Sequence, residues 1–238
     1  MYSKRKYRDL FKGINLEFFQ VCVGETDLMI GAGKNLEREA LSAVRKYRAQ
    51  IEKYIEEHPD FKASLVPVPA SANAPYIVAE MCAAGYAAGV GPMASVAGAL
   101  AQMVGEELLK QTDEIIVENG GDIYIKTNSI RRTGIFAGNS PLSGKVSIEI
   151  FPEDTPLGIC TSSGTVGPSV SFGKADAAVI TAKSAFLSDA AATALGNLVK
   201  SEADIVSALE IALSIQGAEG ALVIIGDKMG VMGNIKLA

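Results

Sequence analysis

The 238-residue sequence contains no tryptophan, one histidine and three cysteines. The histidine, His58, precedes a proline in a polar stretch that is typical of a helix end. Zinc sites built on histidine and histidine-centred catalytic triads are therefore nearly excluded. The cysteines Cys22, Cys82 and Cys160 lie far apart, and no pair has metal-ligand spacing or indicates a disulfide framework.

Positive charge is scarce as well. The formal net charge is −5, and the isoelectric point is near 5.1. A general nucleic-acid binder usually carries the opposite sign, because it must neutralise phosphates. The basic cluster at the start of the chain, Lys4-Arg5-Lys6 with Arg8 and Lys12, is best explained as a solvated terminus. We therefore expect no nucleic-acid partner.

No long apolar segment indicates secretion or membrane insertion. The basic start is followed by Asp9 and Glu17 without an apolar stretch, so we expect a cytoplasmic protein. The segment Tyr76–Val104 carries only Glu80 as a charge and is long enough to span a bilayer. It is mostly alanine and glycine, however, and Pro92 interrupts it. We predict two buried helices and no membrane contact.

Hydrophobic residues make up 48% of the chain and charged residues 21%, which allows a sizeable core. Apolar periodicity predicts a long helix that Asn35 can cap. Clustered strands follow clustered helices, which favours an α+β fold over a doubly wound sheet. No linker divides the chain, so we expect a single domain over residues 1–238. The expected strands are 16–23, 27–30, 115–118, 123–126, 132–137, 145–151, 157–161, 177–182, 221–226 and 231–236, and the later helices are 75–88, 92–110, 188–200 and 203–214.

The most informative motif is the alanine-rich segment from Ser188 to Leu195. Asp189 and Thr193 are four residues apart and therefore share one helix face. A carboxylate and a hydroxyl are the hard oxygen ligands that Mg²⁺ prefers. The alternative stays open that Ser188 caps the helix, Asp189 complements its N-terminal dipole and Thr193 is incidental.

Three glycine- and hydroxyl-rich segments are candidate contacts for a ligand. Gly120-Gly121-Asp122 follows Asn119 between two strands and permits a ring or phosphate to approach the backbone. The loop Thr161-Ser162-Ser163-Gly164 can line a phosphate site with N–H groups and hydroxyls. Gly91–Gly98 opens a helix whose N–H groups can hold a phosphate. Taken singly, Gly120-Gly121-Asp122 is better explained as an ordinary turn and Thr161–Gly164 as a plain loop. Tight helix packing explains Gly91–Gly98 at least as well as a phosphate site does.

Taken in order, these segments resemble the ApbE-type flavin transferases. That family shows a small-residue helix start, a strand ending in Gly-Gly-Asp, a strand leading into a Thr-Ser-Gly loop, and an Ala-Asp-Ala-X-X-Thr-Ala helix. The counterparts here are Gly91–Gly98, Gly120-Gly121-Asp122, Thr161–Gly164 and Asp189–Leu195. The chain looks most like the uncharacterised, shorter branch of this superfamily found in anaerobic archaea and bacteria.

The resemblance implies an ApbE-like α+β fold, with FAD as ligand and Mg²⁺ as metal. Family members transfer FMN to a threonine of a target protein and release AMP. Carried over, Asp189 and Thr193 become the metal ligands, beside a backbone carbonyl from near Ala94. The acceptor protein is unknown, and a homodimer is the default expectation. The residues implied in holding the flavin or its phosphates are Gly91, Ala94, Asn119, Gly120, Gly121, Asp122, Thr161, Ser162, Ser163 and Gly164.

One departure from the family concerns catalysis. The transferases carry a His-X-Ile-Asp-Pro segment after the Thr-Ser-Gly loop, whereas Gly167–Gly173 contains no histidine here. The Ala-Lys-Gly after the family's helix start is also replaced, by Ala94-Ser95-Val96. The catalytic residues are thus unassigned, with Asp176 and Asp122 as candidate replacements for the base. The missing histidine predicts flavin binding with weak FMN transfer.

Three classes of function stay open. The first is a flavin- or nucleotide-binding protein with Mg²⁺, which acts as a divergent FMN or phosphoryl transferase. The second is a non-catalytic ligand- or partner-binding subunit on the same scaffold. The third is an enzyme of anaerobic metabolism that acts on another small molecule through the hydroxyl-rich segment Thr161–Ser171.

Overall fold

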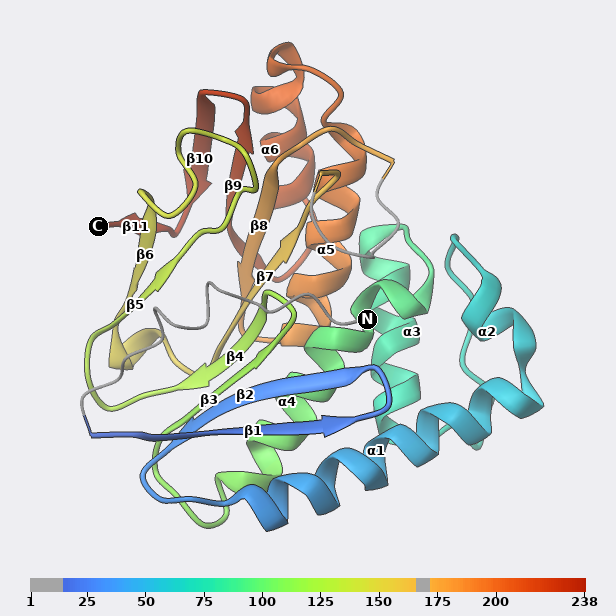
Figure 1. The fold of residues 1–238 in the computed structure, drawn as a ribbon. Coiled ribbons are helices and arrows are strands. Elements are labelled where there is room, and N and C mark those ends of the chain that lie inside the picture. The colour runs from blue at the N-terminus through green and yellow to red at the C-terminus, as the bar shows by residue number, and fades with distance from the viewer. Residues whose placement is uncertain (1–14, 166–171) are drawn as a thin grey trace.

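An antiparallel sheet of eight strands forms the centre of the fold (Figure 1). The computed structural model describes residues 15–165 and 172–238. The strand order is β1-β2-β3-β4-β7-β8-β9-β10, and each neighbouring pair is antiparallel. The strands are β1 (Glu17–Val23), β2 (Thr26–Ala32), β3 (Ile115–Asn119), β4 (Asp122–Lys126), β7 (Leu157–Ser162), β8 (Ala177–Ala182), β9 (Ala218–Ile225) and β10 (Lys228–Gly233).

The α-helices lie on one side of this sheet (Figure 1). The α4 and α5 helices pack against the central strands β3, β4, β7 and β8, while α1 packs on β1 and α6 on β9 and β10. A short 3₁₀ helix, η2, leads directly into α4. The helices are α1 (Glu37–Glu57), α2 (Pro59–Ala63), α3 (Tyr76–Ala88), η2 (Pro92–Ser95), α4 (Val96–Leu108), α5 (Ala185–Leu198), η4 (Glu202–Asp204) and α6 (Ile205–Leu213).

A second, three-stranded sheet covers the opposite face, in the order β11-β6-β5 (Figure 1). Its strands are β5 (Arg131–Gly134), β6 (Ser147–Ile150) and β11 (Lys236–Leu237), and a short 3₁₀ helix, η3 (Pro152–Asp154), follows β6. Alternation along the central strands produces two cores, because successive side chains point to opposite faces. Tyr124 and Cys160 face the helices, whereas Ile123, Ile125 and Ile159 face the small sheet.

The predicted α+β class is confirmed, and several predicted strands agree closely with those observed. Residues 177–182 form β8 with the predicted bounds, and the hairpin across Gly120 and Gly121 connects β3 to β4. The predicted cap of α1 is displaced by one residue, since the N-cap is Leu36. Asn35 nevertheless accepts a hydrogen bond from Glu37 N at 2.9 Å.

Other elements differ from the sequence-based expectation. The helix expected over 92–110 begins as the 3₁₀ turn η2 and ends at Leu108. The proline-rich loop contains an unpredicted short helix, α2. The last strand of the expected hairpin ends at Gly233, and the chain then crosses to the small sheet as β11. The basic cluster near Lys4 and most of the segment 167–173 lie outside the described residues.

The small-residue segment Tyr76–Val104 forms two helices, as predicted. Within the described residues, no single helix is both long and apolar enough to cross a bilayer. The pair Tyr76–Ala88 and Pro92–Leu108 reaches that length and composition only when taken together, and it is bent by 104°.

Candidate functional site

The α5 helix carries Asp189 just beyond its first turn rather than at its start. The helix begins at Ala185, and the side chain of Ser184 caps it by accepting from Leu187 N at 3.4 Å. Asp189 is therefore the fifth helical residue, beyond the first turn. The alternative that Ser188 caps the helix and Asp189 complements its dipole is wrong. Ser188 is instead fully buried, and its hydroxyl donates to the carbonyl of Gly158 at 3.0 Å.

Glycines bring α5 close to its neighbours. A Cβ on Gly98 of α4 would lie 2.3 Å from the carbonyl oxygen of Ala185. A Cβ on Gly158 of β7 would lie 2.5 Å from the Cα of that same residue. Both distances are shorter than any real Cβ contact, so only glycine fits at either position. The close approach places Asp189 directly against the first turn of α4.

Asp189 is 9% exposed, and its Oδ2 accepts a hydrogen bond from Gly98 N at 2.8 Å. Burial raises the pKa of this carboxyl well above its ordinary value, and the neighbouring charge of Asp122 raises it further. The N–H groups of Gly98 and Ala97 oppose that shift without cancelling it. Within the described residues, no lysine or arginine forms an ion pair with Asp189.

The β3–β4 turn lies against the same part of α4. The side chain of Asn119 donates to the carbonyl of Ala97 at 3.1 Å. The next residue, Gly98, is the one whose N–H donates to Asp189. Gly120 and Gly121 have φ angles of 74° and 114°, a region that side chains other than glycine rarely adopt. The structure therefore brings together the Gly-Gly turn and Asp189, which lie far apart in sequence.

Asp122 completes this group from β4. It is 8% exposed, and its Oδ1 accepts a hydrogen bond from Thr161 N at 3.2 Å. Cys160, one residue earlier in β7, is fully buried, and its thiol donates to the carbonyl of Ala185 at 3.6 Å. Burial raises the pKa of the Cys160 thiol well above its usual value, and the charges of Asp122 and Asp189 add to that effect. A thiol with such a pKa stays protonated and is a poor nucleophile.

The hydroxyl-rich loop continues from the end of β7. Ser162 and Ser163 are both 8% exposed. Thr165 N donates to Ser163 Oγ at 3.1 Å, and the Thr165 hydroxyl donates to Asp176 Oδ1 at 2.9 Å. A Cβ on Gly164 would lie 2.3 Å from the carbonyl oxygen of Gly173, so the loop is packed against the segment that leads into β8.

The other predicted site residues are less closely associated with Asp189 and the Gly120-Gly121 turn. Gly91 packs against the loop before α3, since a Cβ there would lie 1.9 Å from the carbonyl oxygen of Ser64. Ala94 is partly buried against the helix-side core. The N–H of Gly98, expected to be available for a phosphate, donates to Asp189 instead. Thr193 is half-buried on α5, one turn beyond Asp189, and its side chain makes no hydrogen bond with a described residue.

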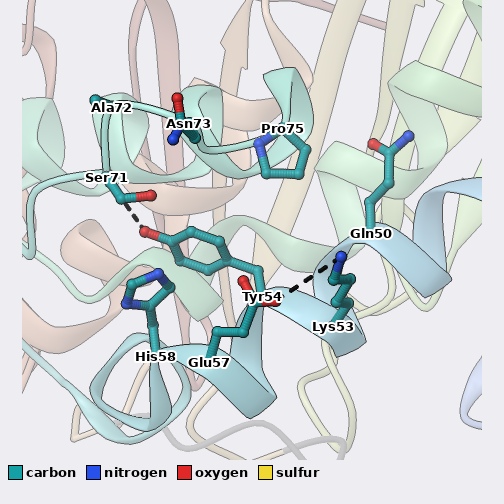
Figure 2. A pocket seen from close by; sticks show the side chains of 9 residues that line it. All are labelled: Gln50, Lys53, Tyr54, Glu57, His58, Ser71, Ala72, Asn73 and Pro75. Carbon is teal, nitrogen blue, oxygen red and sulfur yellow. Dashed lines mark hydrogen bonds and ion pairs between the residues drawn. The ribbon is translucent and has the colours of Figure 1, made fainter.

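A separate pocket of 540 Å³ opens between α1 and the loop that precedes α3 (Figure 2). Tyr54 accepts a hydrogen bond from Ser71 N at 3.0 Å, and its ring lies 4.3 Å from that of His58. The only histidine of the chain thus lines a pocket that none of the predicted site residues lines. The complete lining is Gln50, Lys53, Tyr54, Glu57, His58, Ser71, Ala72, Asn73 and Pro75.

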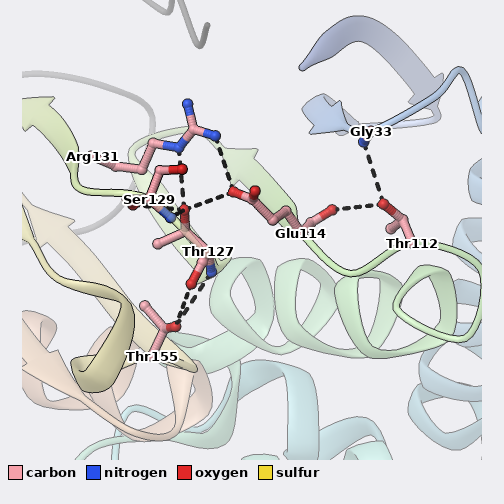
Figure 3. A network of polar contacts seen from close by, with 7 residues as sticks. All are labelled: Gly33, Thr112, Glu114, Thr127, Ser129, Arg131 and Thr155. Carbon is pink, nitrogen blue, oxygen red and sulfur yellow. Dashed lines mark hydrogen bonds and ion pairs between the residues drawn. The ribbon is translucent and has the colours of Figure 1, made fainter. Parts of the chain in front are cut away.

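A polar network connects the two sheets at the other end of β3 and β4 (Figure 3). Arg131 of β5 forms an ion pair with Glu114 at 3.0 Å, and the Thr127 hydroxyl donates to the same carboxylate at 2.8 Å. Thr155 accepts from Thr127 N at 3.3 Å. Burial raises the pKa of Glu114, but hydrogen bonds from Arg131, Asn128 N and Thr127 outweigh it and hold the pKa below its ordinary value.

Cys160 and Ser188 lie beside the cluster formed by Asp189, Asp122 and the Gly120-Gly121 turn. The sequence analysis did not identify either residue as part of it. The position of Cys160 could have been predicted from the sequence, because it precedes the Thr-Ser loop and its side chain points opposite to that of Ile159. The Ser188 contact could not, since it depends on Gly158, which is distant in sequence. Sequence reasoning also did not predict the bond between Thr165 and Asp176, which joins a loop to the start of another strand.

Comparisons with known proteins agree with an ApbE-like fold. Solved structures of the ApbE flavinyl transferase of Pseudomonas stutzeri and the ApbE flavin transferase of Vibrio cholerae align with TM-scores of 0.58 and 0.57. Each is 12% identical to this chain, and each alignment covers 92% of this chain. The alignments cover 94% of the Pseudomonas stutzeri chain and 96% of the Vibrio cholerae chain. The chain therefore has the fold of the ApbE flavin transferases.

Sequence comparisons place the chain in a family. A family model described as "AbpE bacteria" matches residues 8–228, and the chain belongs to this family. A UPF0280 protein of Methanocella arvoryzae is 41% identical over 214 residues, which cover 90% of this chain and 87% of the relative. Another UPF0280 protein, from Methanocaldococcus jannaschii, is 41% identical over 222 residues, covering 91% and 90%.

Proposed function

We propose that this protein binds FAD together with Mg²⁺ at the cluster formed by Asp189, Asp122 and the Gly120-Gly121 turn, and that it is a divergent FMN transferase. The observation that carries the proposal is the environment of Asp189. This carboxyl group is buried beside a second carboxyl group, and no described lysine or arginine compensates it. Burying a charge without a partner is unfavourable, and a bound divalent cation would remove that penalty.

The donor set suits magnesium better than a metal that needs a cage of side chains. Among the described residues, no group of three or more His, Cys, Asp or Glu side chains could hold a metal ion. Mg²⁺ binds through one or two carboxylates and fills its octahedral shell with water and phosphate oxygens. Asp189 and Thr193 would supply the ligands from α5. The backbone donors to Asp189 leave room for a metal, because a carboxylate offers about four lone-pair sites.

The surrounding groups fit a nucleotide. The glycines at 120 and 121 leave the turn without side chains, so a flat ring or a phosphate can approach its backbone. The hydroxyl of the buried Ser162 can donate to a phosphate oxygen. Mg²⁺ bound there would offset the charge that develops on the phosphate leaving group during transfer.

The proposal is tested first by ligand binding. Purified protein is heated with FAD and MgCl₂, with each alone, and with EDTA; a Tm increase that requires both ligands supports the site. Asp189→Ala should abolish the Mg²⁺-dependent part, because the carboxylate is the charged ligand. Thr193→Val removes a neutral oxygen and should weaken binding less.

The control variant for that experiment is Asp227→Ala, which changes an exposed carboxylate in the β9–β10 turn. It should leave the Mg²⁺-dependent shift intact. A shift that survives Asp189→Ala unchanged would contradict the metal assignment.

The second candidate function is a non-catalytic binding subunit. It is favoured by the position of the only histidine, which lines the pocket of Figure 2 together with Tyr54 rather than the Asp189 cluster. FAD binding without release of AMP would identify this alternative. The predicted homodimer and cytoplasmic location stay predictions.

A further inference from the structure

A chain of hydroxyl groups connects the loop after β7 to a carboxylate outside the Asp189 cluster. Ser163 Oγ lies 3.4 Å from Thr165 Oγ1, which lies 2.9 Å from Asp176 Oδ1. An ionised carboxylate only accepts hydrogen bonds, so Thr165 is the donor to Asp176. Its hydrogen is thereby used, and Ser163 must donate in the contact between the two hydroxyls. The hydrogen bonds therefore point from Ser163 toward Asp176.

Backbone groups hold Asp176 in this orientation. Gly226 N, in the β9–β10 turn, donates to Asp176 Oδ2 at 2.8 Å. The backbone N–H of Asp176 donates in turn to the carbonyl of Ile224, also at 2.8 Å. Each carboxylate oxygen thus has a fixed partner. Asp176 is only half-buried, so a proton that reaches it can pass to solvent.

The Ser163 end of this series of hydroxyl groups lies beside the proposed ligand site. Thr161 N donates to Asp122, one of the two clustered carboxylates. Ser163 follows two residues later, which is at most about 7 Å along an extended backbone. Ser163 is 8% exposed, so its hydroxyl is largely shielded from water that would compete for its hydrogen bonds.

We infer that Ser163, Thr165 and Asp176 form a proton relay that accepts the proton of an attacking hydroxyl group. This inference rests on the proposed function. The acceptor hydroxyl gives its proton to Ser163 Oγ, while Ser163 passes its own proton to Thr165, and Thr165 passes its proton to the Asp176 carboxylate. The acceptor oxygen forms a bond to the FMN phosphorus of FAD, and the P–O bond to AMP breaks. AMP leaves with the electron pair, and Asp176 later releases the proton to solvent.

Ser163 is the group that contacts the acceptor, and Thr165 and Asp176 act through it. The test uses the full-length protein with FAD, MgCl₂ and N-acetylthreonine amide, and it measures AMP release and FAD binding separately. Asp176→Asn should slow AMP release by about 10²–10⁴-fold, the usual contribution of a general base, with FAD binding unchanged. Thr165→Val should have a similar effect, whereas Thr165→Ser keeps the hydroxyl and should restore the rate.

A pH profile separates a relay from a merely structural role. The pH dependence of the wild-type rate should change in Asp176→Asn, because an amide cannot accept the proton that the relay delivers. Asp227→Asn, the same change at an exposed neighbour of Gly226, should keep both rate and profile.

Wild-type rate and profile in Asp176→Asn would overturn the relay alone. FAD binding without AMP release by the unmodified protein would overturn the relay together with the proposed transferase activity, and would identify the non-catalytic binding subunit. Absence of FAD binding would instead refute the proposed function itself.

Discussion

Two carboxylates near opposite ends of β3 and β4, the half-buried Glu114 and the buried Asp189, have contrasting environments. Glu114 lies in the network of Figure 3, where Arg131 and Thr127 donate to it and hold its pKa below the ordinary value. Asp189 receives backbone N–H groups and faces Asp122, and burial raises its pKa well above the ordinary value. An arginine compensates the charge of Glu114, which is typical of a structural role. Asp189 accepts only backbone hydrogen bonds, and no described lysine or arginine compensates its charge, which is typical of a functional site.

The largest expected effect concerns the packing that holds Asp189 in place. Gly98→Ala would place a Cβ 2.3 Å from the Ala185 carbonyl oxygen and 2.8 Å from the Asp189 Cβ. Neither helix backbone can move freely, so we expect a loss of about 3 kcal/mol in unfolding free energy. Urea denaturation measures this.

Gly134→Ala is the control for that substitution, because a Cβ there meets nothing within 4 Å. It should change the denaturation midpoint little. If Gly98→Ala were as stable as Gly134→Ala, the close contact between α4 and α5 would not exist.

A smaller effect is expected at the structural network. Arg131→Met removes the charged donor from the half-buried Glu114 and leaves only Thr127 and Asn128 N to stabilise its charge, which should cost about 2 kcal/mol at neutral pH. The sign of the pH dependence follows from the lowered pKa of Glu114. The stabilisation is complete above the pKa of the unfolded chain and is lost as the pH falls through the folded pKa. Arg131→Met should therefore be less harmful in acid than at neutral pH.

Urea denaturation of the wild type and of Arg131→Met, from neutral to acid pH, checks the prediction. Arg132→Met is the matched control, since Arg132 pairs with Glu149 at 2.8 Å but its side chain is 66% exposed. An Arg131→Met defect that is independent of pH would indicate lost packing rather than lost charge pairing.

The contrast between these two regions could be predicted from the sequence only in part. The Gly-Gly-Asp turn and the Asp189 helix were identified because their residue types and order form a pattern. The start of α5 was misplaced, because Ser184 and Ser188 both precede apolar residues and either could cap the helix. The charge compensation of Glu114 depends on Arg131, which comes from another sheet. Such contacts are set by tertiary packing, and local sequence carries no signal for them.

The smallest effect gives the most direct comparison of the two carboxylates. Asp189→Asn keeps the size of the side chain and an oxygen that can accept from Gly98 N, and it removes a charge that burial disfavours. In EDTA, this variant should lose no more than about 1 kcal/mol of unfolding free energy and can gain some. Glu114→Gln, the equivalent change, should lose more, because it removes the charge that Arg131 pairs with. With FAD and MgCl₂ the order should reverse, since only wild-type Asp189 would gain from the metal. A Glu114→Gln protein that is more stable in EDTA than Asp189→Asn would mean that Asp189 is the structural carboxylate of the two.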